Sequence, residues 1–196
     1  MQQLIVQKFG GTSVGSGERI AAVAGIIKKE SEINSVVVVV SAMAGETDRL
    51  IELSKQFGDN QNKREFDALI STGEKVSASL LAMALNSLGL KAKSYTAAQV
   101  SLKTTSNFSK AMILDIDKAK MEEILADDSI PIITGFQGIT ETGEVTTLGR
   151  GGSDTTAVAI AASIKANRCD IYTDVDGIYT TCLLYTSPSP RDQRGS

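Results

Sequence analysis

Five consecutive valines, Val36–Val40, constrain the fold of this chain more than any other segment. Valine is β-branched and favours strands. A strand that is apolar on both faces needs cover on both sides, which is typical of the centre of a parallel sheet between layers of helices. The run is also far too short to span a membrane. The segment therefore predicts an α/β protein, and we expect no membrane partner.

Strands and helices are predicted to alternate along the rest of the chain. Strands are expected at 4–6, 91–95, 130–134 and 170–173, and helices at 18–29, 47–56, 66–69, 73–88 and from Ser153 or Asp154 to about 166. A Thr-Gly turn inside an alternating segment predicts a hairpin over 137–147. Together these elements predict an α/β sandwich with a mostly parallel central sheet.

Charge and composition exclude several functions. The 196 residues carry a net charge of −3, which argues against electrostatic binding of nucleic acid. The chain has no histidine, so any catalysis must use carboxylates, lysines, arginines, hydroxyls or backbone amides. The two cysteines, Cys169 and Cys182, cannot form a disulfide framework, and the N-terminus does not resemble a signal peptide. We therefore expect a cytoplasmic protein.

Three glycine-containing loops follow apolar strands, at 8–13, 41–47 and 149–154. Ligands of parallel α/β sheets bind beyond the carboxyl ends of the strands, so we expect these loops to converge on one crevice. Gly10 and Gly11 would let backbone amides approach an anion, and Lys8 could contact a phosphoryl oxygen. Neither the P-loop pattern nor the dinucleotide-binding pattern is present.

Each candidate residue also has a simpler structural explanation. The glycine pair is compatible with an ordinary turn, and Ser41 with a capping or turn hydroxyl. Glu74 is compatible with a solvated carboxylate at a helix start, and Asp154 with a helix N-cap. Their shared placement at strand-to-helix junctions favours a binding site.

Five motifs resemble those of the aspartokinases, in the amino-acid kinase family. They are Lys-Phe-Gly-Gly-Thr-Ser-Val at 8–14, Ser-Thr-Gly-Glu at 71–74, Gly-Phe-Gln-Gly at 135–138, and the segments 147–156 and 172–181. The resemblance covers residues 1–181 in the family's order, and is greatest to the monofunctional enzymes. It implies a partial catalytic domain over 1–181, with a three-layer sandwich that is C-terminally incomplete.

The resemblance implies phosphorylation of the side-chain carboxylate of L-aspartate by Mg-ATP, giving 4-phospho-L-aspartate. This is the first step of the pathway to lysine, threonine and methionine. A carboxylate is already ionised at neutral pH, so the reaction needs no general base. Alignment and neutralisation of charge on the moving phosphoryl group remain for the protein to provide. Mg²⁺ is expected to arrive with ATP, without a metal site formed by the protein.

The same resemblance implies roles for individual residues. Lys8 would contact the transferred phosphoryl group, and Asp154 would hold Lys8 in place. Glu74 would pair with the α-ammonium of aspartate, and Arg150 would clamp a substrate carboxylate. Further aspartate contacts are implied for Ser41, Thr47, Phe136 and Ser153, and nucleotide contacts for Lys8, Gly10, Gly11, Thr173, Asp174 and Tyr179.

The chain departs from the family after Thr181. Asp-Pro-Arg is expected there, but Cys182-Leu183-Leu184 follows. Residues 182–196 contain two of the three prolines and look like translated sequencing-adapter read-through; a natural disordered tail is the alternative. By the resemblance, the rest of the kinase domain and the ACT domains are missing. The ACT domains would carry feedback inhibition by lysine or threonine and much of the homo-oligomer contact.

Two other functions remain open. One is a truncated, non-catalytic module that binds aspartate or nucleotide. The other is a related kinase of the same family, such as the acetylglutamate, glutamate and uridylate kinases, although the motifs at 71–74 and 149–154 favour aspartate.

Overall fold

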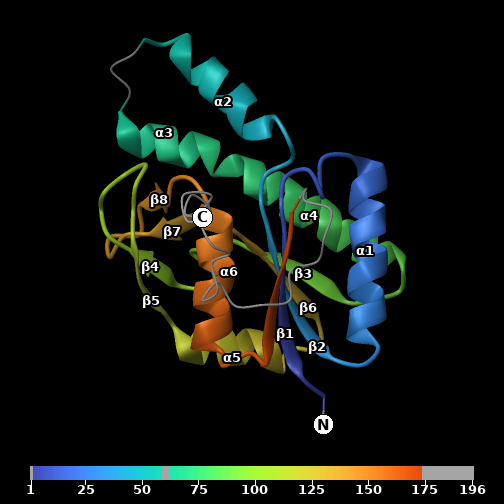
Figure 1. Ribbon diagram of the computed structural model, residues 1–196. Coiled ribbons are helices and arrows are strands. Elements are labelled where there is room, and N and C mark those ends of the chain that lie inside the picture. The colour runs from blue at the N-terminus through green and yellow to red at the C-terminus, as the bar shows by residue number, and fades with distance from the viewer. Residues whose placement is uncertain (1, 59–61, 174–196) are drawn as a thin grey trace, which may run out of the picture.

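A five-stranded parallel sheet forms the central layer of the fold (Figure 1). The structure is a computed structural model and describes residues 2–58 and 62–173. The strands lie in the order β3 (Ala92–Tyr95), β6 (Ile130–Thr134), β2 (Ser35–Val40), β1 (Leu4–Phe9) and β9 (Arg168–Tyr172). Every pairing in this sheet is parallel. The five valines lie in β2, the middle strand, which confirms the prediction of a mostly parallel α/β fold.

Helices cover both faces of this sheet (Figure 1). Side chains of α1 (Gly17–Ser31) and α4 (Thr72–Ser87) form one hydrophobic cluster with Val36, Val38 and Val40. Side chains of α5 (Lys118–Ala126) and α6 (Gly152–Ser163) form the other, with Val37 and Val39. Because alternate strand residues point to opposite faces, one apolar strand supplies both cores, and the fold has three layers.

A second sheet lies beside the first, in the order β5 (Ile113–Ile116), β4 (Leu102–Thr104), β7 (Gln137–Ile139) and β8 (Val145–Thr147). The predicted hairpin is confirmed as the antiparallel pair β7–β8, in which Gln137 lies opposite Thr147. Strands β4 and β5 and helix α5 were not predicted.

Helices α2 (Glu46–Lys55) and α3 (Lys63–Ile70) lie at the end of the central sheet where β1 and β2 finish (Figure 1). Only Ser71 separates α3 from α4. The stretch 63–87 is long and apolar enough to cross a membrane, but half of its apolar 18-residue window is buried inside the fold. Such burial is typical of a core helix in a soluble protein.

The predicted cap of α6 is wrong. The helix begins at Gly152, its N-cap is Gly151, and no side chain caps it. Gly149 and Gly151 both have left-handed backbone, with φ of +81° and +72°, so the chain turns into the helix before it reaches Ser153. The loop that contains these glycines follows β8 of the second sheet, and not a strand of the central sheet.

Candidate functional site

The loops that follow β1 and β2 pack directly on each other. The Ala44 N–H donates to the Gly11 carbonyl at 3.0 Å, and the Ser41 N–H donates to the Phe9 carbonyl at 3.1 Å. A Cβ atom on Gly11 would lie only 2.7 Å from the Ala42 carbonyl oxygen. Gly11 is therefore required by this close approach of two backbones.

We expect Gly11→Ala to lower the free energy of unfolding of the full chain by about 1 to 3 kcal/mol, because the methyl group would force the two loops apart. Urea denaturation followed by circular dichroism would measure the change. Gly17→Ala is the matched control, since a Cβ atom there meets nothing within 4 Å. Equal unfolding midpoints for the two variants would contradict the role given to Gly11.

Lys8 joins the β1 loop to helix α6. Its Nζ lies 2.7 Å from Asp154 Oδ1, and the Lys8 side chain is 8% exposed. The N–H of the neighbouring Gly10 donates to the Tyr172 carbonyl at the end of β9, at 3.2 Å. Asp154 is thus not the N-cap of α6, and its contact is an ion pair with a buried lysine. The first and third glycine loops meet here, as predicted.

Glu74 lies in the first turn of α4 and is 3% exposed. Its Oε1 accepts from the Ala42 N–H at 3.1 Å. Its Oε2 is buried and has no hydrogen-bond partner among the described residues. Burial raises the pKa of this carboxyl to about 7, although the backbone N–H groups of Glu74 and Ala42 act in the opposite direction. The explanation of Glu74 as a solvated carboxylate is therefore wrong. Its Oε2 can accept a hydrogen bond from a donor group of a ligand.

Phe136 and Ser153 lie together where β6 meets the start of α6. A Cβ atom on Gly135, which follows β6, would lie 2.7 Å from the Ser153 side chain. Phe136 has a φ of +66°, and its ring lies 3.0 Å from the position of a Cβ atom on Gly152. This tight packing fixes the N-terminus of α6 against the end of the central sheet.

Four further predicted site residues lie in or beside the described loops and helices of this part of the fold. Ser41 is half-buried after β2, where its carbonyl accepts from Ser77 Oγ at 2.6 Å. Thr47 is half-buried in α2, and Thr173 is exposed directly after β9. Arg150 is exposed, and no described residue forms an ion pair or hydrogen bond with its side chain. Asp174 and Tyr179 lie outside the described residues.

Two polar residues near the site were missed by the sequence analysis. Asp67 is fully buried in α3 and accepts four hydrogen bonds. Thr134, the last residue of β6, has a buried hydroxyl without a hydrogen-bond partner among the described residues. Both lie in segments that read as ordinary helix or strand, so no local pattern marks them.

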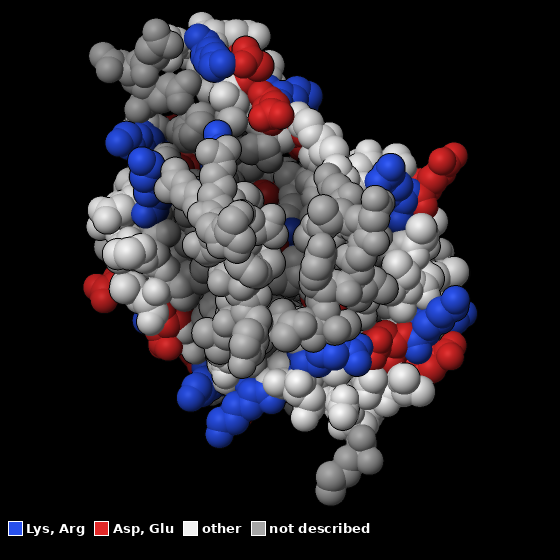
Figure 2. All heavy atoms as spheres, in the orientation of Figure 1, with Lys and Arg blue, Asp and Glu red and all other residues white. Residues whose placement is uncertain are grey.

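Side chains of both charge signs lie around the edge of the face in Figure 2. Within the described residues there is no group of three Asp, Glu, Cys or His side chains that could hold a metal ion. Lys8, with the backbone amide of Gly11 in the loop that follows it, suits an anionic group, and the unpartnered Glu74 oxygen suits a cationic one.

The chain is similar in sequence to known proteins. The pattern of the Amino acid kinase family matches residues 3–182. The aspartokinase of Bacillus sp. (strain MGA3) is 57% identical over 93% of this chain and 44% of its own length. The aspartokinase of Geobacillus stearothermophilus is 56% identical over 93% of this chain and 45% of its own length. The chain thus spans less than half the length of these relatives.

Two solved structures share the fold. Aspartate kinase from Synechocystis superposes with a TM-score of 0.78 at 49% identity, over 89% of this chain and 28% of that one. E. coli aspartokinase III in complex with aspartate and ADP superposes with a TM-score of 0.76 at 27% identity. That comparison covers 89% of this chain and 50% of the E. coli chain.

Proposed function

We propose that this chain, which belongs to the amino acid kinase family, carries the aspartate site and part of the nucleotide site of an aspartokinase. The observation that carries the proposal is a pair of buried groups of opposite charge at one end of the sheet. One is the buried Glu74 carboxylate with an unpartnered oxygen, and the other is the buried Lys8 ammonium. Similarity to aspartokinases over 93% of the chain supports the choice of substrates.

In the proposed reaction, a side-chain carboxylate oxygen of L-aspartate attacks the γ-phosphorus of ATP. A new P–O bond forms, the bond to the β–γ bridging oxygen breaks, and ADP leaves with the electron pair. No proton has to be removed, because the attacking carboxylate is ionised at neutral pH. A chain without histidine is therefore chemically adequate for this reaction.

Lys8 acts on the phosphoryl group that moves. Negative charge shifts toward the bridging oxygen in the transition state, and a preorganised cation in a buried position stabilises it. Asp154 holds the Lys8 ammonium in position for the transferred phosphoryl group through the 2.7 Å contact between Lys8 Nζ and Asp154 Oδ1. The backbone amide of Gly11 would add a donor on the same side, whereas the Gly10 N–H is bonded to the Tyr172 carbonyl.

Glu74 and Arg150 bind the substrate amino acid. The unpartnered Oε2 of Glu74 accepts from the α-ammonium of aspartate, and the exposed guanidinium of Arg150 forms paired hydrogen bonds with a carboxylate. Further contacts are proposed for Ser41, Thr47, Phe136 and Ser153, as the resemblance implies. Thr173, Asp174 and Tyr179 stay predicted contacts of the nucleotide.

Mg²⁺ is expected to enter bound to ATP. The described residues contain no group of three Asp, Glu, Cys or His side chains that could hold a metal ion, and we assign no step to a metal held by the protein. A catalytic domain over residues 1–181, a cytoplasmic location and a homo-oligomer formed through ACT domains are further parts of the proposal.

A hydroxylamine trap for acyl phosphates tests the proposal. The assay would use this chain and a chimaera in which its residues 1–181 replace the matching part of the Bacillus sp. (strain MGA3) aspartokinase. We expect ATP-dependent hydroxamate from the chimaera with L-aspartate, and none with L-glutamate or N-acetyl-L-glutamate. Product from one of the latter would indicate a related kinase. Aspartate binding without product in both proteins would favour a non-catalytic module.

A further inference from the structure

Asp67 is a buried carboxylate whose partners are all uncharged. Its Oδ2 accepts from the backbone N–H groups of Ser109 and Thr147, both at 2.8 Å. Its Oδ1 accepts from the hydroxyls of the same two residues, at 2.9 and 3.0 Å. Four donors match an ionised carboxylate, which can only accept. A carboxylate that is fully buried without a cation is costly unless its hydrogen bonds are complete, as they are here.

These bonds fasten two segments that are distant in the sequence. Thr147 is the last residue of β8, and the loop with Arg150 follows it directly. Ser109 has a φ of +67°, which is uncommon for a residue other than glycine. The Ser109 carbonyl oxygen lies 3.5 Å from the position of a Cβ atom on Gly149, and the Ala111 N–H donates to the Thr147 carbonyl at 2.9 Å. Asp67 therefore holds both the start of the turn that leads to Arg150 and the neighbouring loop that packs beside this turn.

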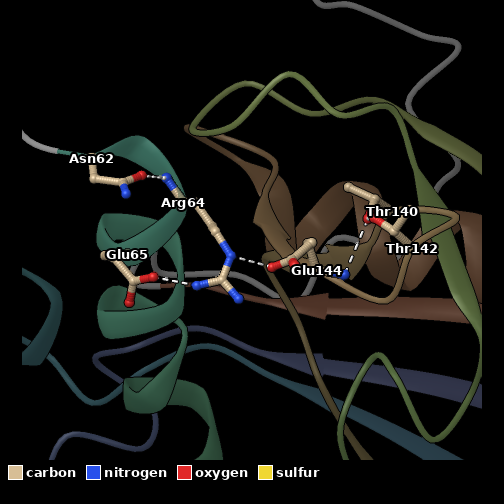
Figure 3. Close-up of polar contacts among 6 residues, drawn as sticks. All are labelled: Asn62, Arg64, Glu65, Thr140, Thr142 and Glu144. Atoms are coloured by element: carbon tan, nitrogen blue, oxygen red, sulfur yellow. Dashed lines mark hydrogen bonds and ion pairs between the residues drawn. The ribbon is translucent and has the colours of Figure 1, made fainter.

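Helix α3 contacts the β7–β8 hairpin at three points along its length. Near its start, Arg64 on α3 reaches across to Glu144 on the hairpin, as Figure 3 shows. Asp67 makes the central contact. At its end, the Ser71 carbonyl accepts from Gln137 Nε2 at 2.9 Å. The first contact is exposed, whereas the other two are buried.

We propose that Asp67 is a positioning residue for aspartate binding. The α3 helix and the hairpin each lead to one substrate group: Glu74, where α4 continues from α3, and Arg150, which follows β8. By fixing β8 on α3, Asp67 sets the separation between the group for the ammonium and the group for the carboxylate. This inference rests on the proposed function.

Asp67→Ala in the full chain is the main test. The variant leaves two backbone N–H groups without an acceptor, so we expect the loop after β8 to loosen. Amide hydrogen exchange at Leu148 and Gly152, whose N–H groups are bonded in the structure, should accelerate about tenfold or more, while β2 amides keep their protection. The Kd for L-aspartate should rise about tenfold or more, with the Kd for ADP nearly unchanged.

Asp67→Asn should show the amide exchange rates and the Kd for L-aspartate of the wild-type chain. Its amide oxygen can accept from the two N–H groups, and its amide nitrogen can donate to the two hydroxyls, which also accept. Glu144→Gln is the matched control, because it weakens only the exposed contact of the same helix. It should change neither the exchange of Leu148 nor the aspartate affinity.

Thr147→Val is a second variant for the case that Asp67→Ala fails to fold. It removes the Thr147 hydroxyl donor and leaves the two backbone N–H bonds to Asp67 in place. It should accelerate the exchange of Leu148 and weaken aspartate binding in the same direction. Unchanged exchange at Leu148 and Gly152 in either variant would overturn the positioning role. Loss of affinity for aspartate and ADP alike would indicate a merely structural role. A wild-type chain that binds no aspartate would overturn the proposed function, while the exchange data still decide whether Asp67 holds the loop.

Discussion

Lys8→Ala should lower the kcat of the chimaera by about 10²-fold or more, because it removes a preorganised positive charge from the transferred phosphoryl group. Lys8 is a stronger candidate than a surface lysine since its ammonium is buried and paired with Asp154 at 2.7 Å. The Lys8 charge stabilises the transition state more than the bound substrates. Its removal should therefore change the KM for aspartate much less than kcat.

Hydroxamate formation under saturating ATP and aspartate would measure this effect. Lys29→Ala is the control, because Lys29 is exposed in the last turn of α1, at the opposite end of that helix from the loop that follows β1. Asp154→Ala should lower kcat as well, since it leaves the buried ammonium unpaired and free to move. Wild-type turnover in Lys8→Ala would remove Lys8 from the mechanism.

Glu74→Gln should weaken aspartate binding by about 10²-fold or more, because a buried carboxylate is replaced by a neutral group opposite the α-ammonium. In the wild-type chain the affinity should rise with pH through about 7, the pKa of the buried carboxyl, as Glu74 ionises. Below this pH, aspartate binding should release a proton. Calorimetry in two buffers of different ionisation enthalpy would detect the release, which Glu74→Gln should abolish.

The same carboxyl makes stability depend on pH. Its pKa is about 7 in the folded chain, against an ordinary value of 4.5 for a glutamate carboxyl. Between these values the folded state binds more protons than the unfolded state, so the free energy of unfolding falls as the pH rises. At about 1.4 kcal/mol per pKa unit, the contribution lost is about 3 kcal/mol, and the loss is complete above the folded pKa.

Urea denaturation between pH 4.5 and 8 would measure this dependence. Glu74→Gln should lack it and should be the more stable protein at pH 8. Glu18→Gln is the matched control, since Glu18 also lies in the first turn of a helix but is exposed. A wild-type stability that rises from pH 5 to 7 relative to Glu74→Gln would contradict the raised pKa.

Strong local patterns account for the parts of the fold that were predicted. The valine run defined the central strand, and helices expected at 18–29 and 73–88 were found as Gly17–Ser31 and Thr72–Ser87. Strands β4 and β5 were missed because they have only three and four residues. They pair with each other in the second sheet. The start of α6 was misplaced because two left-handed glycines, and not a side-chain cap, determine where the helix begins.

The sequence by itself determined the alternation of strands and helices, the glycine loops at strand ends and the resemblance to aspartokinases. It did so because those features depend on residues that are neighbours in the chain. Only the tertiary structure decided that Glu74 is buried with an unpartnered oxygen, and that Asp154 pairs with Lys8. The same is true of Asp67, whose donors lie 42 and 80 residues away along the chain. No local pattern can report such a contact, because burial and hydrogen bonding at this range exist only once the sheet and its helices have packed.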